Sequence, residues 1–396
     1  MTALDYPFEL SGPLGISSLH TTLREERGLA RIRMTYGGEA WLATRHADVA
    51  QVLSDPRFSR AAAAGRDAPR ARPMFEPPEL IFTMDAPGHT RLRKLVSQAF
   101  TSRRIEQLRP RVRELTGVLV DDLIAAGPPA DLTEKLAWQL PVSIMCELLG
   151  VPTADRNTFR SWTEAISALG VTIAPAEIEA AMGSLSEYIA GLIAQRRERP
   201  TADMISALVA ARDEQDRLSE EELIALTWTL LVAGHETTAN HLGNFMFTLL
   251  AEPDRWRRLV AAPDLLPGAI EELLRYVPIS ASVEFARIAT ADVEVGGQLV
   301  RAGEAVFADM PAANRDERVF VDAEEYVPTR ADNPHLAFGH GPHFCLGSHL
   351  ARLQLNEAIG TLLHRLPGLR LAVPADDVRW RTDRLIRGPL ELPVSW

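Results

Sequence analysis

The alternation of apolar and polar positions along the 396-residue chain predicts a protein built mainly from helices. Apolar residues recur at spacings of three and four across residues 105–123, which is typical of one helix with a buried face. The clearest helix begins near Ser219, where Ser219-Glu-Glu-Glu222 has the form of a capping box. We expect it to continue to about Ala251, because Pro253 is the next helix breaker, and to span roughly 45 Å.

Two glycine pairs indicate a smaller β portion. Gly37-Gly38 and Gly296-Gly297 each lie between short segments of strand-like composition, which is a hairpin pattern. The flanking segments are residues 31–36 and 39–44 for the first pair, and 293–295 and 299–300 for the second. No internal repeat or long linker divides the sequence, so we expect a single domain over residues 1–396, mainly α with a small β portion.

One segment, residues 61–83, differs in composition because it is rich in alanine, arginine and proline. We interpret it as a surface loop, with a ligand-gating role as the alternative.

Polar residues interrupt the long central helix. Residues 223–233 are apolar on nearly all sides and are expected in the core, yet Gly234-His-Glu-Thr-Thr238 follows directly. Burying a carboxylate and two hydroxyls costs several kcal/mol unless they find partners. The hydroxyls could bond back to helix carbonyls while Glu236 reaches solvent or an arginine. Alternatively, a ligand approaches the backbone closely at Gly234, and the residues alone leave both interpretations open.

Composition and charge exclude several classes of protein. Apolar residues make up 46% and charged residues 24%, which excludes disorder over most of the chain. The net charge of −11 argues against nucleic-acid binding. The amino terminus lacks the pattern of a signal peptide, and the apolar window at 223–234 is shorter than the roughly 20 residues of a membrane span. We therefore expect a cytoplasmic protein without membrane contact.

The two cysteines have different surroundings and cannot form a disulfide framework. Cys146 lies in an apolar run and is interpreted as a buried structural residue. Cys345 lies in Phe338–Gly347, which contains three glycines, and a helix is expected just after it. A helix N-terminus favours a thiolate, so Cys345 is a candidate soft metal ligand.

Three interpretations of Cys345 compete. It could be a structural cysteine, a zinc ligand together with His340, His343 and His349, or the single thiolate ligand of a haem iron. The glycines indicate a loop shaped around a bulky planar group, which favours haem over zinc.

The pattern Phe338-Gly339-x-Gly341-x-His343-x-Cys345-x-Gly347 resembles the ligand loop of the cytochrome P450 family, the haem-thiolate monooxygenases. Further segments resemble family elements in the expected order, so the resemblance covers essentially the whole chain. They are His89–Arg93, Ala233–Thr238, Glu272-x-x-Arg275 and Tyr326–Arg330, the last with Tyr in place of Phe, while Asp85–Gly88 departs from the family pattern at Ala86 and Gly88.

The resemblance implies a cytochrome P450 fold with a long central helix over haem b, and a role for each matched residue. Cys345 would be the iron ligand, and Glu236 and Thr237 would organise proton delivery for dioxygen activation, with Gly234 leaving space for oxygen. The expected partners of the haem propionates are His89, Arg93, Arg287 and His343, and the expected structural network is Glu272, Arg275 and Arg330. The alternative for Arg287 is an exposed strand arginine.

The resemblance also implies partners. A small organic substrate, such as a macrolide or polyketide of antibiotic biosynthesis, would be hydroxylated or epoxidised by a monomeric enzyme. A ferredoxin and its NAD(P)H-fed reductase would supply electrons. Substrate would contact parts of residues 61–84, the helix near Leu230, 279–285 and the loop at Leu385-Ile386.

The ferredoxin would dock on a basic stretch that contains no acid from His89 to Arg104, although an ordinary basic helix face is the alternative. The basic residues of this stretch are Arg91, Arg93, Lys94, Arg103 and Arg104.

Two rival functions remain, namely a zinc metalloprotein and a haem-binding sensor without turnover. The Glu236-Thr237 pair argues against the sensor.

Overall fold

The computed structural model describes residues 3–168, 173–213 and 217–396. Its contacts group the chain into two compact units. We call them the sheet unit (residues 1–78, 82–90 and 267–346) and the helical unit (residues 79–81, 91–266 and 347–396). Helices make up about 52% of the chain and the sheets are small, which confirms the prediction of a mainly α protein.

The sheet unit contains a six-stranded mixed sheet in the order β1-β2-β3-β9-β6-β4. Both predicted hairpins are confirmed, since β2 pairs antiparallel with β3, and β7 pairs antiparallel with β8. The strands are β1 (Leu4–Asp5), β2 (Leu29–Arg33), β3 (Glu39–Ala43), β4 (Phe58–Ser59), β6 (Arg287–Ala289), β7 (Val293–Val295), β8 (Gln298–Val300) and β9 (Ala305–Ala308). The helices of this unit are α1 (Ser18–Glu26), α2 (His46–Ser54), α12 (Leu266–Tyr276) and α13 (Met310–Ala313). Only the first residue of α12, Leu266, belongs to the other unit.

The core of the sheet unit lies on both faces of the sheet. Alternate residues of β2 point to opposite sides, so Leu29 packs with Val49 and Val52 of α2, while Ile32 packs in a second cluster with Phe307. Strands buried on both faces fix the register of the sheet, because a one-residue slip would exchange the two sets of side chains.

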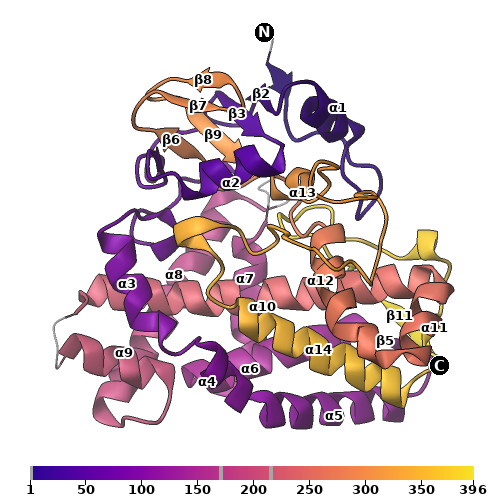
Figure 1. The fold of residues 1–396 in the computed structure, drawn as a ribbon. Helices are drawn as coiled ribbons and strands as arrows, with labels where there is room; N and C mark the ends of the chain where they lie inside the picture. The colour runs from indigo at the N-terminus through magenta and orange to yellow at the C-terminus, as the bar shows by residue number, and fades with distance from the viewer. Residues whose placement is uncertain (1–2, 169–172, 214–216) are drawn as a thin grey trace. The chain divides into compact units, whose positions relative to one another are not determined.

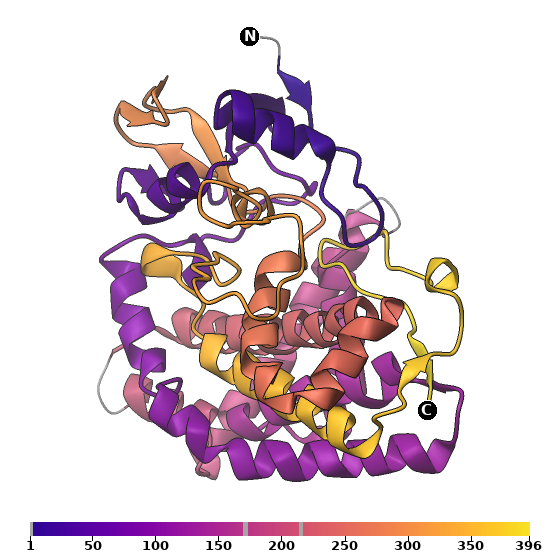
Figure 2. The ribbon, with the colours of Figure 1, turned by 45° about the vertical axis from the view of Figure 1, so that its right-hand side comes forward.

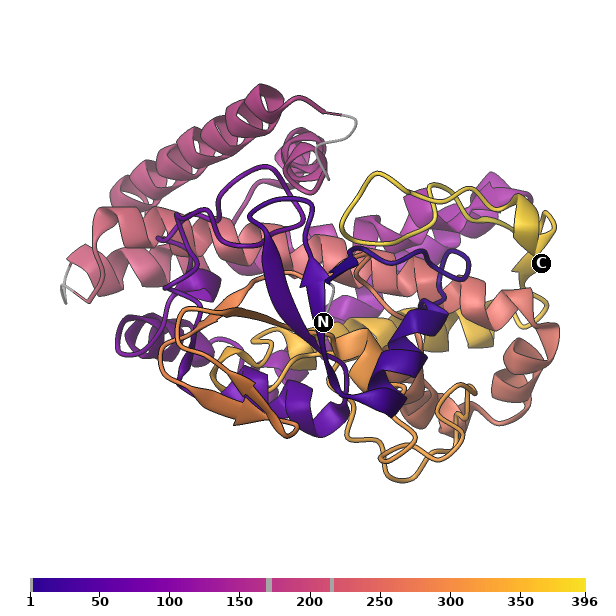
Figure 3. The ribbon, with the colours of Figure 1, turned by 90° about the horizontal axis from the view of Figure 1, so that it is seen from above.

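The helical unit contains the long helix α10 and the helices that pack on it (Figure 1). α6, α8 and α14 contact α10, and α8 also contacts α7 and α9 (Figure 3). α5 packs along α14 (Figure 1). The bounds are α4 (Ser102–Gln107), α5 (Arg109–Ala126), α6 (Gln139–Leu149), α7 (Arg156–Ile166), α8 (Pro175–Glu198), α9 (Met204–Asp213), α10 (Glu220–Ala251), α11 (Pro253–Ala261) and α14 (Ser348–Arg365). Helix α3 (Gly88–Ser97) begins in the sheet unit and ends in the helical unit.

The predicted bounds of the central helix are confirmed. α10 runs for 32 residues, and Ser219 caps it through its side chain while Glu222 bonds back to the Ser219 backbone. Leu223, Leu226 and Leu231 are buried, so the helix does pass through the core of its unit.

The expectation of one continuous helix over residues 105–123 is wrong. The structure has two helices, because α4 ends at Gln107 and α5 begins at Arg109, with Leu108 between them. Pro110 lacks a backbone N–H and fits only the first turn of a helix, where that group has no partner in any case. The apolar spacing continues through the break because both helices bury the same side of the chain.

The remaining segments are short. The carboxyl-terminal chain returns to form a three-stranded sheet in the order β10-β11-β5 (Figure 2). Its strands are β5 (Ala130–Asp131), β10 (Arg370–Leu371) and β11 (Pro393–Ser395). Residues 61–83 form a loop as predicted, with one isolated bridge at Arg70 and a short helical turn at Ile81–Thr83. None of the described helices is long and apolar enough to span a membrane.

Candidate functional site

The loop that carries Cys345 is shaped by glycines and by its own backbone. Gly339 and Gly341 have φ angles of 74° and 70°, in the left-handed region that favours glycine. The backbone N–H of Cys345 donates to Phe338 O at 2.8 Å and closes the loop. At Gly341 a Cβ atom would lie 2.8 Å from Leu53 O, so the loop packs against the end of α2 only if this position has no side chain.

The two cysteines differ as the sequence predicts. Cys146 is fully buried on α6, and burial raises the pKa of its thiol to about 12, so it acts as a packing residue. Cys345 is exposed on its loop, and α14 begins at Ser348 just after it. Cys345 is therefore the cysteine that a ligand can reach.

Cationic and imidazole groups accompany Cys345 in the sheet unit. The rings of His89 and His343 lie 4.1 Å apart. Arg287 begins β6 and is only 6% exposed, so the alternative of an exposed strand arginine is wrong. Among the described residues, its guanidinium has neither a hydrogen bond nor an ion pair. Burial and the charge of Arg60 lower the pKa of Arg287 to about 9.

These residues fit haem. Haem b combines an iron that a thiolate can ligate with two carboxylates, and Arg287 is a buried cation that lacks an anion. Zinc is less well supported, because the side chains of the described residues form no group of three or more that could hold a metal ion. The proposed zinc set of His340, His343, Cys345 and His349 is therefore not assembled.

Arg93 belongs to the other unit but to the same helix as His89. Both lie on α3, where His89 is buried and Arg93 is half-buried.

The middle of α10 carries the other predicted site residues. The hydroxyl of Thr237 donates to Ala233 O at 3.1 Å, so the expectation that hydroxyls bond back to the helix is correct here. Thr237 is half-buried and Ala233 is exposed, although most neighbouring positions of the helix are buried. At Gly234 a Cβ atom would lie 2.5 Å from the Cε atom of Met145, which gives this glycine a packing role against α6. Space for oxygen at Gly234 stays a prediction.

Glu236 is a buried acid with a partner that the sequence does not predict. It is 6% exposed and accepts a hydrogen bond from the hydroxyl of Ser167, which follows α7. Burial raises the pKa of Glu236, while the Ser167 hydrogen bond and the nearby Arg381 and Arg384 oppose that effect. A carboxyl group with a raised pKa keeps its proton to higher pH, as a proton donor requires.

The adjacent His235 has a different role. It is fully buried between Leu231 O, 2.7 Å from Nδ1, and the hydroxyl of Thr163, 3.3 Å from Nε2. Burial lowers the pKa of His235 to about 4, so the ring is neutral near pH 7 and packs α10 against α7.

The predicted network of Glu272, Arg275 and Arg330 is assembled in the sheet unit. Arg275 donates twice to the Glu272 carboxylate, at 2.7 and 2.8 Å, and Arg330 Nε donates at 3.0 Å. Burial opposes ionisation, but these hydrogen bonds hold the pKa of Glu272 below its ordinary value. The remaining donors of Arg275 bind the backbone carbonyls of Asn314, Ala323 and Glu325, so the network pins the segment that leads to the cysteine loop.

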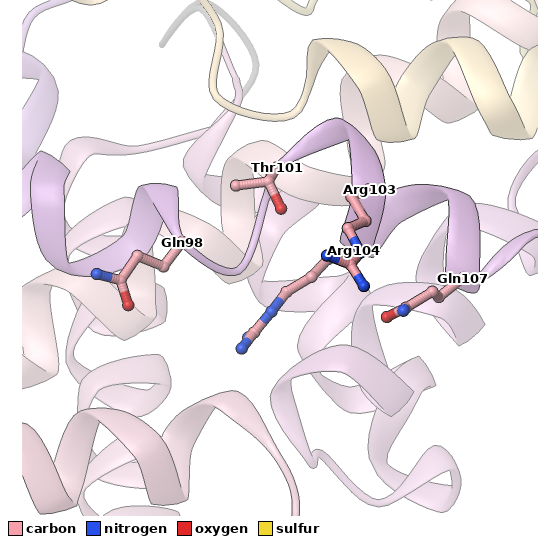
Figure 4. A pocket seen from close by; sticks show the side chains of 5 residues that line it. All are labelled: Gln98, Thr101, Arg103, Arg104 and Gln107. Carbon is pink, nitrogen blue, oxygen red and sulfur yellow. The ribbon is translucent and has the colours of Figure 1, made fainter.

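The basic stretch contains a hollow on the helical unit. A cavity of about 490 Å³ is lined by Arg103 and Arg104 of α4 together with Gln98, Thr101 and Gln107 (Figure 4). Arg91 does not add a free charge, since it pairs with Glu222 and donates to Arg217 O. The exposed cations that remain on α3 and α4 are Lys94, Arg103 and Arg104.

Comparison with known proteins extends the resemblance along the chain. The family model described as cytochrome P450 matches residues 175–379. Nocardicin C N-oxygenase of Nocardia uniformis subsp. tsuyamanensis is 50% identical, over 99% of this chain and 98% of that protein. Mycinamicin IV hydroxylase/epoxidase of Micromonospora griseorubida is 47% identical, with the same coverage of the two chains. The crystal structure of a cytochrome P450 hydroxylase from the leinamycin pathway of Streptomyces atroolivaceus superposes with a TM-score of 0.92, at 48% identity over 100% of both chains.

Relatives of this identity and coverage, together with the exposed cysteine on its glycine-shaped loop, lead to one conclusion: the chain belongs to the cytochrome P450 family of haem b monooxygenases.

Proposed function

We propose that this enzyme inserts one oxygen atom from dioxygen into a secondary metabolite, such as a macrolide or polyketide. The single observation that carries the proposal is the exposed Cys345 on a loop closed by its own backbone N–H. The substrate class is supported by relatives named for nocardicin C and mycinamicin IV. The enzyme would act in the cytoplasm as a monomer with a single domain over residues 1–396.

When bound, haem supplies a thiolate-ligated iron that activates dioxygen. The chain's own residues bind it and manage protons. Cys345 provides the sulfur ligand, while Arg93 and Arg287 with His89 and His343 hold the propionates by charge-assisted hydrogen bonds. None of these roles needs a side chain from outside the chain.

Proton delivery is assigned to α10. Burial raises the pKa of Glu236, so its carboxyl group keeps a proton to higher pH than an exposed glutamate does. The neighbouring Thr237 hydroxyl is fixed by its bond to Ala233 O and can still accept and pass on a proton. Substrate contacts with residues 61–84, Leu230, 279–285 and Leu385-Ile386 stay predictions.

Electrons would come from a ferredoxin and its reductase. On a chain with a net charge of −11, Lys94, Arg103 and Arg104 form a local basic surface that would attract an acidic partner. We call these three residues the basic surface.

Thr237→Ala tests the proposed reaction directly. We expect NAD(P)H consumption to continue while product formed per NAD(P)H falls about ten-fold or more, because the hydroxyl that passes the proton is lost. Thr227→Ala is the matched control, since Thr227 makes the same kind of bond to a helix carbonyl, 2.8 Å from Leu223 O. If Thr237→Ala forms as much product per NAD(P)H as the wild type, Thr237 does not lie on the proton path.

Ser167→Ala tests the partner of Glu236. The Ser167 hydrogen bond favours the carboxylate, so its loss should raise the pKa of Glu236 further. Because a proton donor works only while protonated, the fall in product formation at high pH should move to higher pH than in the wild type. Ser161→Ala is the control, since Ser161 is exposed and donates only to Thr158 O on the same helix. If product formation in a folded Ser167→Ala enzyme falls at the same high pH as in the wild type, Ser167 does not control the pKa of Glu236.

Charge reversal tests the basic surface. Lys94→Glu with Arg103→Glu should slow reduction by a ferredoxin about ten-fold at low salt, and the difference should shrink as salt screens the charges. The chain has only one other lysine, Lys135, which lies outside α3 and α4, so Lys135→Glu is the control. Equal rates for the double variant and wild type at low salt would place the docking surface elsewhere.

A further inference from the structure

A second buried arginine, Arg60, directly follows β4, the strand that pairs with the Arg287 strand β6. Strands β4 and β6 pair antiparallel, with Phe58 opposite Ala289 and Ser59 opposite Ile288. β4 ends at Ser59, so Arg60 is the first residue after the paired segment, and Arg287 is the next residue of β6 in the same register. The charge of Arg60 acts on Arg287, so the two guanidinium groups lie near each other at this end of the strand pair.

Both guanidinium groups are buried without a hydrogen-bonded or ion-paired partner in residues 3–168, 173–213 and 217–396. Arg60 is 7% and Arg287 is 6% exposed. The Nε atom of Arg60 is buried with no acceptor. Burial lowers the pKa of Arg60 to about 10, and burial with the charge of Arg60 lowers that of Arg287 to about 9. Buried like charges near each other destabilise a strand pair unless an anion joins them.

Asp85, which acts electrostatically on both arginines, does not provide that anion. Asp85 accepts from the Ser59 hydroxyl and from the backbone N–H groups of Arg60 and Ala61, so its oxygens hold the turn after β4. Glu76 and Glu284 attract Arg60 electrostatically, but neither forms an ion pair with it. The donors of both arginines are left for a carboxylate from outside the chain.

Phe285 holds Arg60 in position. Its ring lies 4.3 Å from the Arg60 guanidinium carbon and 5.0 Å from the ring of Phe82. The backbone of Phe285 has φ of 61°, a left-handed conformation that is strained for a bulky residue and that persists only where surrounding contacts enforce it. A ring stacked on one face of a guanidinium leaves its edge N–H groups free for an acceptor.

We propose that Arg60 and Arg287 form a paired guanidinium clamp for one carboxylate, and that this carboxylate is a haem propionate. The inference rests on the proposed function, and it adds Arg60 to the four side chains already assigned to the propionates. A planar guanidinium binds a carboxylate through two parallel hydrogen bonds, so a neighbouring pair can bind it together. Arg60 also places a second positive charge beside the propionate, which favours reduction of the iron.

Arg60→Met in the holoenzyme tests the clamp. The resonance Raman propionate-bending band should shift, the reduction potential of the substrate-free enzyme should fall, and haem transfer to apomyoglobin should accelerate about ten-fold. Arg60→Lys should recover part of the potential, because it keeps the charge but lacks the fork of donors. Arg57→Met is the matched control, since Arg57 lies on the same segment but is exposed and pairs with Asp55 at 2.6 Å.

An unchanged propionate band and an unchanged haem-transfer rate in Arg60→Met would overturn the clamp. The same would follow if those two readouts stayed constant while Arg60→Met bound benzoate about ten-fold more weakly than the wild type, because the pair would then serve a substrate carboxylate. A wild-type protein that takes up no haem would instead overturn the proposed function, so the two failures are distinguishable.

Discussion

The hydrogen bonds to the buried Glu272 carboxylate are the interactions that support the segment before the cysteine loop. The carboxylate is fully buried and accepts from Arg275, from Arg330 and from the backbone N–H of Val327 at 2.9 Å. Removing one partner of a buried ion pair typically lowers the stability of the fold by about 3–5 kcal/mol. The Glu272 carboxylate and its donors therefore hold one another in place. Through them α12 is bonded to the segment after α13, which leads into the Phe338–Cys345 turn.

Buried ionisable groups in this protein are compensated in three different ways. The Glu272 carboxylate is satisfied within the chain, which makes it structural. Burial raises the pKa of the Glu236 carboxyl group, so it keeps a proton to higher pH, as a proton donor requires. Arg60 and Arg287 have neither an ion-pair partner among the described residues nor a pKa low enough to lose their charge near pH 7. We therefore propose an anion from outside the chain as their partner. The way in which each charge is compensated therefore indicates its function.

Much of this arrangement follows from local sequence signals. The capping box at Ser219 and the breaker at Pro253 predict the bounds of α10, and the glycine pairs predict both hairpins. Other features depend on tertiary contacts that no local pattern reports. Ser167 meets Glu236 across 69 positions of sequence, and Arg60 meets Arg287 only because β4 pairs with β6. Apolar spacing likewise reports which side of a helix is buried but not where the backbone breaks, so it missed the end of α4.

The most direct test of the account is the difference spectrum of the reduced, carbon-monoxide-bound protein, measured for wild type and Glu272→Gln. The wild type should show the red-shifted Soret band of a thiolate-ligated haem. The variant should bind less haem and lose part of that band, because the Cys345 loop is no longer fixed. Glu39→Gln is the control, since Glu39 is exposed on β3 and pairs with the exposed Arg33 of β2 at 3.4 Å. A wild-type spectrum without the thiolate band, or a Glu272→Gln spectrum with the full band, would contradict the account.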